Sequence, residues 1–201
     1  MSHRDYLVID LEATCDDQGA VPRDQMEIIE IGAVWVEGQT LQPIAEFQSF
    51  IKPVRHPRLT RFCTALTSIT QADVDRAPGF RMALRGLEQF ITEHRGTRPP
   101  IFGSWGNYDR NQFRQDGRRH GVKPSFLGEH LNIKQAFSDA LDTRKRFGMG
   151  RALMRVGLPL EGTHHRGIDD ARNIAKLLPF ALGRQPLPTP PQGWRRKRYQ
   201  T

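Results

Sequence analysis

The sequence YLVIDLEA at residues 6–13 combines an apolar run with two acidic residues at alternating positions. A short run rich in Val, Ile and Leu favours a buried β-strand, and we predict a strand over residues 6–11. Side chains two positions apart in a strand project from the same face, so Asp10 and Glu12 are expected to lie side by side. The segment therefore predicts a strand that ends in a pair of neighbouring carboxylates.

Paired carboxylates repel each other unless a cation compensates their charge. Carboxylate oxygens suit hard cations such as Mg²⁺ or Mn²⁺, which makes this strand end a candidate metal site. The alternative is an exposed strand end that enters the polar loop DDQG at residues 16–19. The motif by itself fits both interpretations.

The sequence on either side of this strand predicts an α/β fold. Strand-like runs follow at residues 28–36 and 45–51, and with the first strand they predict an antiparallel meander. A short apolar run at residues 101–103 predicts a further buried strand. Helical spacing appears at residues 60–74, 79–94, 107–120, 133–140, 148–155 and 169–182. This order resembles the ribonuclease H-like plan, a mixed sheet of three antiparallel strands and helix-linked parallel strands, flanked by helices.

The length and charge of the chain predict one domain with a basic appendage. The 201 residues suit a single domain, for which we expect residues 1–182. Residues 183–201 contain four prolines, five basic residues and no acidic residue, which predicts an extended or disordered tail. The net charge of +8 suggests a polyanionic partner.

The composition favours a cytoplasmic protein. No apolar stretch approaches the ~20 residues of a membrane-spanning helix, and the N-terminus lacks the pattern of a signal peptide. Two cysteines, Cys15 and Cys63, are too few for a disulfide framework. We expect both thiols to be reduced and no membrane to be a partner.

Two further motifs place acidic residues at the start of predicted helices. SWGNYD (104–109) puts Asp109 where a strand gives way to a helix, a position that also suits a simple helix cap. HHRGIDDARNIA (164–175) puts Asp170 in the first turn of another helix and His165 on the loop before it. A loop histidine has the freedom that a general base needs, and a helical carboxylate has the rigid mount that a metal ligand needs.

Together these motifs resemble the DEDDh family of 3′–5′ exonucleases, in which Asp-x-Glu, Asp and His-x4-Asp follow one another. More specifically, the chain is similar to the ERI-like branch of histone-mRNA and small-interfering-RNA exonucleases and its bacterial relatives. The resemblance covers about residues 5–182. It rests on DLEATC (10–15), EIIEIGAVWV (27–36), FCTALTSITQADVDRAP (62–78), SWGNYD and HHRGIDDARNIA.

The resemblance implies a catalytic centre with two divalent cations, Mg²⁺ or Mn²⁺. The residues that it implies as metal ligands are Asp10, Glu12, Asp109 and Asp170, and the general base is His165. Because both residue types are doubled, His164 and Asp169 form a second pair at the same spacing. The family uses the second of each, which leaves Asp169 to cap its helix and His164 as a loop residue.

The resemblance also implies residues that bind the terminal nucleotide, besides Glu12 and His165. Phe62 and Leu66 match apolar residues that hold the terminal base, and a spacing of four places them on one helix face. Ordinary core packing is their alternative role. Trp105 and Tyr108 flank the second motif, and either side chain suits stacking on a base.

The implied activity is removal of nucleoside 5′-monophosphates from the 3′ ends of single-stranded nucleic acid, with RNA favoured and DNA the alternative. Two rival functions are a nucleic-acid-binding module without catalysis and an endonuclease of the same fold. Arg110, Arg114 and Arg118 recur every four residues. A solvated helix face is the default role of such a stripe, and contact with phosphates is the alternative.

Overall fold

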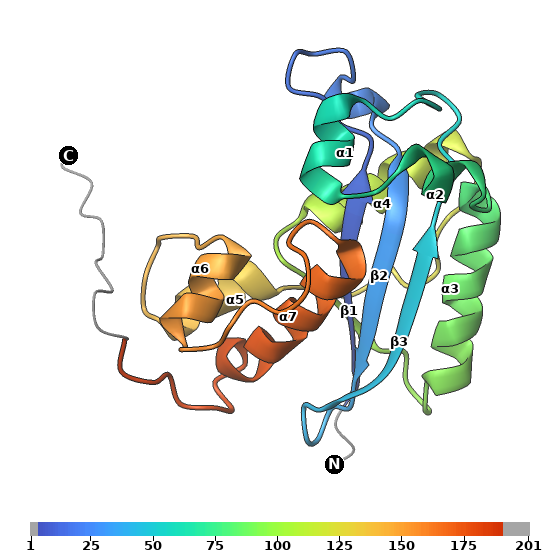
Figure 1. Cartoon of the computed structure of the whole chain (residues 1–201). Helices are drawn as coiled ribbons and strands as arrows, with labels where there is room; N and C mark the ends of the chain where they lie inside the picture. Colours follow the sequence, from blue (N-terminus) through green and yellow to red (C-terminus); the bar gives the residue numbers. More distant parts are fainter. Residues whose placement is uncertain (1–3, 191–201) are drawn as a thin grey trace.

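The structure is a computed structural model that describes residues 4–190. Its single sheet has the strand order β3-β2-β1-β4-β5, of which Figure 1 labels β3, β2 and β1. The strands are β1 (Tyr6–Ala13), β2 (Ile28–Val36), β3 (Pro43–Phe50), β4 (Ile101–Ser104) and β5 (His130–Asn132). β1, β2 and β3 pair in antiparallel fashion, whereas β4 runs parallel to β1 and to β5. The predicted mixed sheet of an α/β fold is confirmed.

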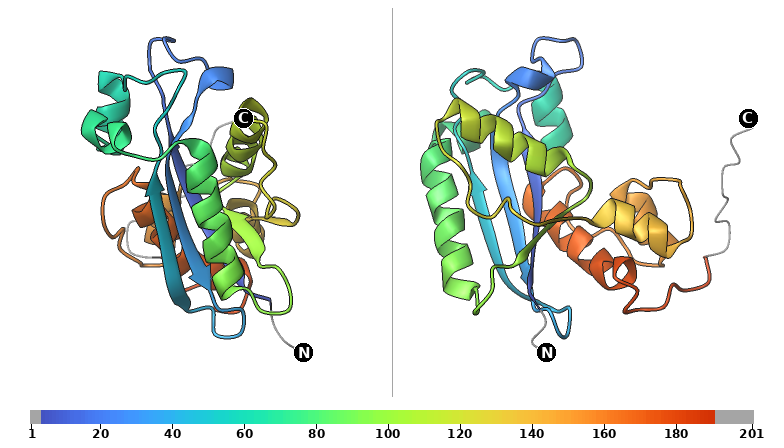
Figure 2. Two further views of the ribbon diagram at one scale, coloured as in Figure 1. Left: turned by 90° about the vertical axis from the view of Figure 1, so that its right-hand side faces the viewer. Right: turned by 180° about the vertical axis from the view of Figure 1, so that it is seen from behind.

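Helices cover both faces of this sheet (Figures 1 and 2). They are α1 (Arg61–Thr67), α2 (Gln71–Asp75), α3 (Phe80–His94), α4 (Tyr108–Arg119), α5 (Ile133–Ala140), α6 (Met149–Arg155) and α7 (Gly167–Ala181), with a short 3-10 turn at Arg23–Gln25. One buried cluster joins α5, α6 and α7 to the sheet, and a second joins α3 and α4 to its other face.

The alternation of side chains along β1 decides which face carries the acidic residues. Leu7 and Ile9 pack in the cluster with α3 and α4, and Val8 packs in the cluster with α7. Because side chains two apart share a face, Asp10 and Glu12 continue the Val8 side and project toward α7. Asp10 and Glu12 of β1 therefore lie on the face of the sheet that is covered by α7, the helix that carries Asp170.

Two details of the predicted elements were wrong. The helix expected over residues 60–74 is interrupted. α1 ends at Thr67, its C-cap residue Ser68 has a left-handed φ of 61°, and Thr70 caps α2 in a capping box with Asp73. Strand β5 was not predicted, because three residues are too few for a periodic pattern. Within residues 4–190 no helix is both long and apolar enough to cross a membrane. Most of the predicted tail, residues 191–201, lies outside the described residues.

Candidate active site

Four carboxylates meet beside the end of β1. Oxygen atoms of Asp10, Glu12 and Asp170 lie within 4.8 Å of one another. Asp109, in the first turn of α4, accepts a hydrogen bond from the Leu11 backbone N–H at 3.2 Å, so it lies against the same strand. Asp109 comes from the chain just after β4, which runs parallel to β1 and ends at the same edge of the sheet. The Asp109 side chain thus contacts β1, and no side chain among residues 4–190 caps α4, so the alternative role of Asp109 as a helix cap finds no support.

Helix α7 is brought close to the sheet by Glu30 and two glycines. A Cβ built on Gly32 of β2 would lie 2.1 Å from the backbone of Gly167, so only glycine permits this approach. The fully buried Glu30 carboxylate accepts hydrogen bonds from the Gly167 N–H at 3.0 Å and from Arg166 Nε at 3.2 Å. Glu30 therefore fixes the start of the helix that carries Asp170, a positioning role that the sequence motifs did not reveal.

Burial and mutual repulsion disfavour full ionisation of these four carboxyl groups. Burial, followed by the charges of Asp109 and Glu12, raises the pKa of Asp10 well above its ordinary value. Burial and then the charge of Asp170 raise the pKa of Glu12 to about 9. Burial also raises the pKa of Asp109 to about 6 and lifts the pKa of Asp170. Buried carboxylates of this kind need either protons or cations, and an all-oxygen donor set fits a hard divalent cation.

These raised pKa values predict that the metal-free protein loses stability as the pH rises. The pKa of Glu12 moves from its ordinary 4.5 in the unfolded chain to about 9 in the fold, so the folded protein binds this proton more tightly. Stability should therefore fall between these values, and melting in EDTA should occur at a higher temperature near about pH 5.5 than near about pH 8.5. Mg²⁺ or Mn²⁺ should restore the melting temperature mainly at the higher pH.

Circular dichroism melts of the parent protein and of Glu12→Gln measure this effect. The variant cannot ionise at position 12, so its melting temperature in EDTA should depend less on pH than that of the parent. A metal-free parent that is more stable near about pH 8.5 would contradict the electrostatic interpretation of the cluster.

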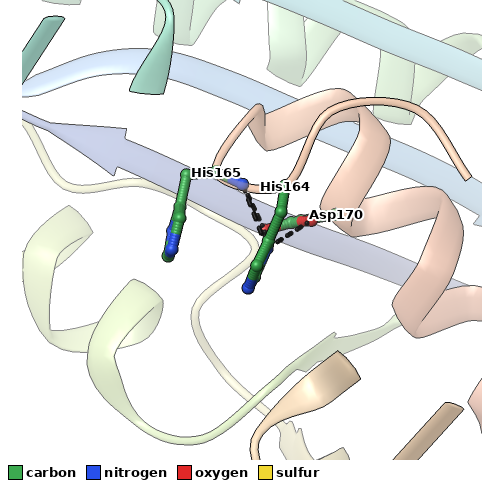
Figure 3. A group of neighbouring side chains, drawn as sticks. All are labelled: His164, His165 and Asp170. Atoms are coloured by element: carbon green, nitrogen blue, oxygen red, sulfur yellow. Dashed lines mark hydrogen bonds and ion pairs between the residues drawn. The ribbon is translucent and has the colours of Figure 1, made fainter. Parts of the chain in front are cut away.

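The two histidines occupy different positions beside Asp170 (Figure 3). His164 Nδ1 lies 2.9 Å from Asp170 Oδ2, and the backbone N–H of His165 donates to the same oxygen at 3.1 Å. The two rings stack with centroids 4.0 Å apart. His165 has a φ of 64°, and within residues 4–190 its ring makes no hydrogen bond. The ring of His165 is thus free to accept a proton, whereas His164 is engaged with Asp170.

The electrostatics of His165 favour its neutral form. Burial and the neighbouring His164 lower its pKa below the ordinary 6.5, and the charge of Asp170 opposes them more weakly. A neutral imidazole at neutral pH is the form in which a general base accepts a proton.

The expectation that Asp169 caps α7 is wrong. The N-cap position is Arg166, and no side chain caps this helix. Asp169 instead accepts the Thr163 backbone N–H at 2.9 Å and pairs with Arg172 at 2.9 Å. Asp169 therefore links the loop at Thr163 to helix α7, and only Asp170 of this pair joins the carboxylate cluster.

A cleft of about 410 Å³ surrounds the carboxylates and histidines. Asp10, Glu12, Asp109, His165 and Asp170 all line it, as do Leu66, Trp105 and Tyr108. Phe62 does not line this cleft, although it lies half-buried on α1. Neither Phe62 nor Leu66 belongs to the buried apolar clusters of the described residues, so their alternative role as core residues finds no support.

The two aromatic candidates differ in how firmly they are held. Trp105 Nε1 donates to the Phe147 carbonyl at 3.0 Å, and its ring lies 5.9 Å from that of Phe137. Tyr108 keeps 45% of its surface exposed. Trp105 therefore forms a fixed wall of the cleft, while Tyr108 offers an open ring face.

Several lining residues were not predicted. Met26, Met149 and Ile174 are apolar residues that reach the cleft from separate parts of the chain, and Cys15 is the last residue of DLEATC (10–15). No local pattern distinguishes such side chains from core residues, so only the fold identifies them. Of these four residues, only Cys15 belongs to a motif that the sequence analysis identified.

The chain is similar in sequence to known exonucleases. The family model described as Exonuclease (RNase T) matches residues 7–178. Human ERI1 exoribonuclease 3 is 32% identical over 184 residues, which cover 86% of this chain and 52% of the relative. The 3′-5′ exonuclease Snipper of Drosophila melanogaster is 31% identical over 189 residues, covering 86% of this chain and 67% of that protein. The chain thus spans about half the length of the first of these relatives.

A solved structure shows the same architecture. The nuclease domain of 3′hExo, a DEDDh family member bound to rAMP, superposes with a TM-score of 0.83 at 28% identity. The match covers 90% of this chain and 93% of that domain. The likeness therefore extends over nearly the whole of both folds.

Proposed function

Because the chain belongs to the exonuclease (RNase T) family and to its DEDDh branch, we propose that this protein is a 3′–5′ exonuclease acting on single-stranded RNA. The family membership confirms the resemblance that the motifs indicated. The observation that carries the proposal is the convergence of Asp10, Glu12, Asp109, Asp170 and His165 in one cleft. An acidic cluster without cations would repel phosphate, so a pure binding module has no use for it.

The carboxylates of the cluster are proposed to hold two divalent cations, Mg²⁺ or Mn²⁺. Held by these carboxylates, such cations would supply charge that lowers the pKa of a water molecule and stabilises the leaving 3′ oxygen. His165 takes the proton of the attacking water at its free ring, the water oxygen joins phosphorus as the bond to the 3′ oxygen breaks, and the 3′ oxygen takes up a proton from solvent. The products are a shortened strand with a 3′ hydroxyl and a nucleoside 5′-monophosphate.

The remaining lining residues are proposed to select a strand end. Leu66 offers an apolar surface and Tyr108 an exposed aromatic ring in the same cleft, and both are proposed to contact the terminal base. Phe62 lies one helical turn before Leu66, and its contact with nucleotide stays a prediction. RNA is favoured over DNA because the curated relatives are mostly exoribonucleases and because the matched nuclease domain was solved with rAMP.

Digestion of matched 5′-labelled RNA and DNA oligonucleotides with Mg²⁺ tests the proposal. We expect a ladder that shortens by one nucleotide from the 3′ end, faster on RNA, with 5′-monophosphates as products. A circular single strand should stay intact, since it has no end. Cutting of the circle would indicate an endonuclease, and binding without cleavage would indicate a module that has no catalysis.

A cytoplasmic location and a division into a domain at residues 1–182 and a tail at residues 183–201 are also proposed. Both cysteines are free, which suits a reducing compartment. Residues 183–190, the part of the tail that the structure describes, contain no helix or strand. Recovery of the tagged protein in an exported fraction would contradict the location.

A further inference from the structure

Helix α4 carries a second cleft on the side away from the carboxylates. It measures about 870 Å³, and its charged lining residues are Arg114, Arg118 and Lys123. All three side chains are exposed, and no acidic residue lines this cleft. In the described part of the chain none of the three forms an ion pair or a side-chain hydrogen bond, so their charges are available to a ligand.

The neighbours of this cleft balance its charge only in part. The Glu88 carboxylate accepts the Ser125 N–H at 2.9 Å and keeps its negative charge, whereas Glu129 pairs with Arg4, so within the described chain the three lining cations outnumber the one unpaired acid beside them. Arg110 adds a cation whose Nε is buried without a hydrogen-bond partner among residues 4–190. Burial, followed by the charges of Arg110 and Arg114, lowers the pKa of His130 to about 4. The surface therefore presents positive charge that suits a polyanion.

Helix α4 contributes to both clefts: Tyr108 and Asp109 in its first turn line the catalytic cleft, and Arg114 and Arg118 farther along line the second. Met26 and Tyr108 line both the catalytic cleft and an adjoining one of about 310 Å³, which also contains Asn111. Asn107, Asn111, Arg114 and Arg118 are all exposed, and their spacing places them along one side of the helix. From Asp109 to Arg118 the helix rises about 14 Å, a span that a strand of several nucleotides covers.

We propose that the cleft between α4 and residues 122–128 binds the phosphodiester backbone of the substrate strand upstream of its 3′ end. This inference rests on the proposed exonuclease function and adds a second contact region to it. Arg114 and Arg118 match phosphate oxygens with planar, forked donors, and Lys123 adds a point charge. Leu127 and Pro124 supply an apolar wall against sugars or bases. The solvated-face role leaves unexplained why three unpaired cations line one cleft of the described chain that no acidic residue lines.

A triple variant, Arg114→Ala with Arg118→Ala and Lys123→Ala, tests the proposal. On a long single-stranded oligoribonucleotide its KM should rise roughly tenfold, and the slope of log affinity against log salt should fall by about 2, because each lost phosphate contact removes about 0.7. Hydrolysis of a diribonucleotide without terminal phosphates should not change, since its single phosphate is the one that is cut and none remains upstream for the second cleft.

The matched control replaces Arg58, Arg76 and Arg85 by alanine, which removes the same charge from exposed positions outside the clefts described above. It should leave KM and the salt slope on the long strand unchanged. Unchanged values in the test variant, an equal effect in the control, or an equal loss on the diribonucleotide would each overturn the proposal.

Fluorescence anisotropy of the labelled oligoribonucleotide in EDTA separates this inference from the proposed activity. Weaker binding by the test variant than by the control supports the contact region even if the parent protein hydrolyses nothing. A parent that cleaves RNA, together with equal binding by both variants, retains the exonuclease function and removes the α4 cleft from it.

Discussion

Asp10→Asn should reduce RNA hydrolysis by at least about 10³-fold, because a cation that stabilises developing charge is worth several kcal/mol and about 1.4 kcal/mol corresponds to tenfold. Asp10 lies at the centre of the cluster: Asp109, Glu12 and Asp170 all act on its pKa through their charges. The amide keeps the shape of the side chain and removes its charge. EDTA should have the same effect on the parent protein.

Single-turnover assays with excess enzyme measure the loss without interference from product release. Asp17→Asn is the matched control, since Asp17 is exposed on the loop that follows the same strand and should retain full activity. Metal-free Asp10→Asn should also melt at a higher temperature than the parent at neutral pH, because the fold no longer has to keep a proton on a buried carboxyl group that ionises in the unfolded chain. Near-parent activity in this variant, or in EDTA, would remove the metal-assisted mechanism.

Much of this site was predictable because local rules determine it. The period of two in a strand places Asp10 and Glu12 on one face, and the apolar neighbours Val8 and Ile9 show that the strand is buried. Parallel strands end at one edge of a sheet, which explains why Asp109 arrives beside Leu11 from a distant part of the chain. Spacing indicated that Asp10 and Glu12 lie side by side, whereas the place of Asp109 beside them was an expectation from the family resemblance.

Other features depend on contacts that no local pattern encodes. Asp169 and Asp170 are adjacent in sequence, yet Asp169 fastens a loop through Thr163 while Asp170 faces the cluster. The difference follows from the rotation of 100° per residue about α7 and from where Glu30 anchors that helix. The position of Phe62 outside the cleft lining likewise depends on how α1 lies against the sheet.

The left-handed backbone at His165 is the detail that matters most for the mechanism. A φ of 64° is uncommon for histidine, and here the backbone N–H of His165 donates to Asp170 while its ring stays free. The chain conformation thus separates two adjacent histidines into one that binds Asp170 and one that is available for chemistry. Sequence spacing alone does not distinguish these roles.

His165→Ala should therefore lower kcat by about 10²–10⁴-fold, the range expected for loss of a positioned general base. The rise in melting temperature on adding Mg²⁺ or Mn²⁺ should persist, since the carboxylates are intact. His164→Ala is the matched comparison: it removes a neighbouring ring that contacts Asp170 without removing the free imidazole, and its effect on kcat should be much smaller. If His164→Ala is inactive while His165→Ala turns over normally, the base is His164, and the ring bonded to Asp170 performs the proton transfer.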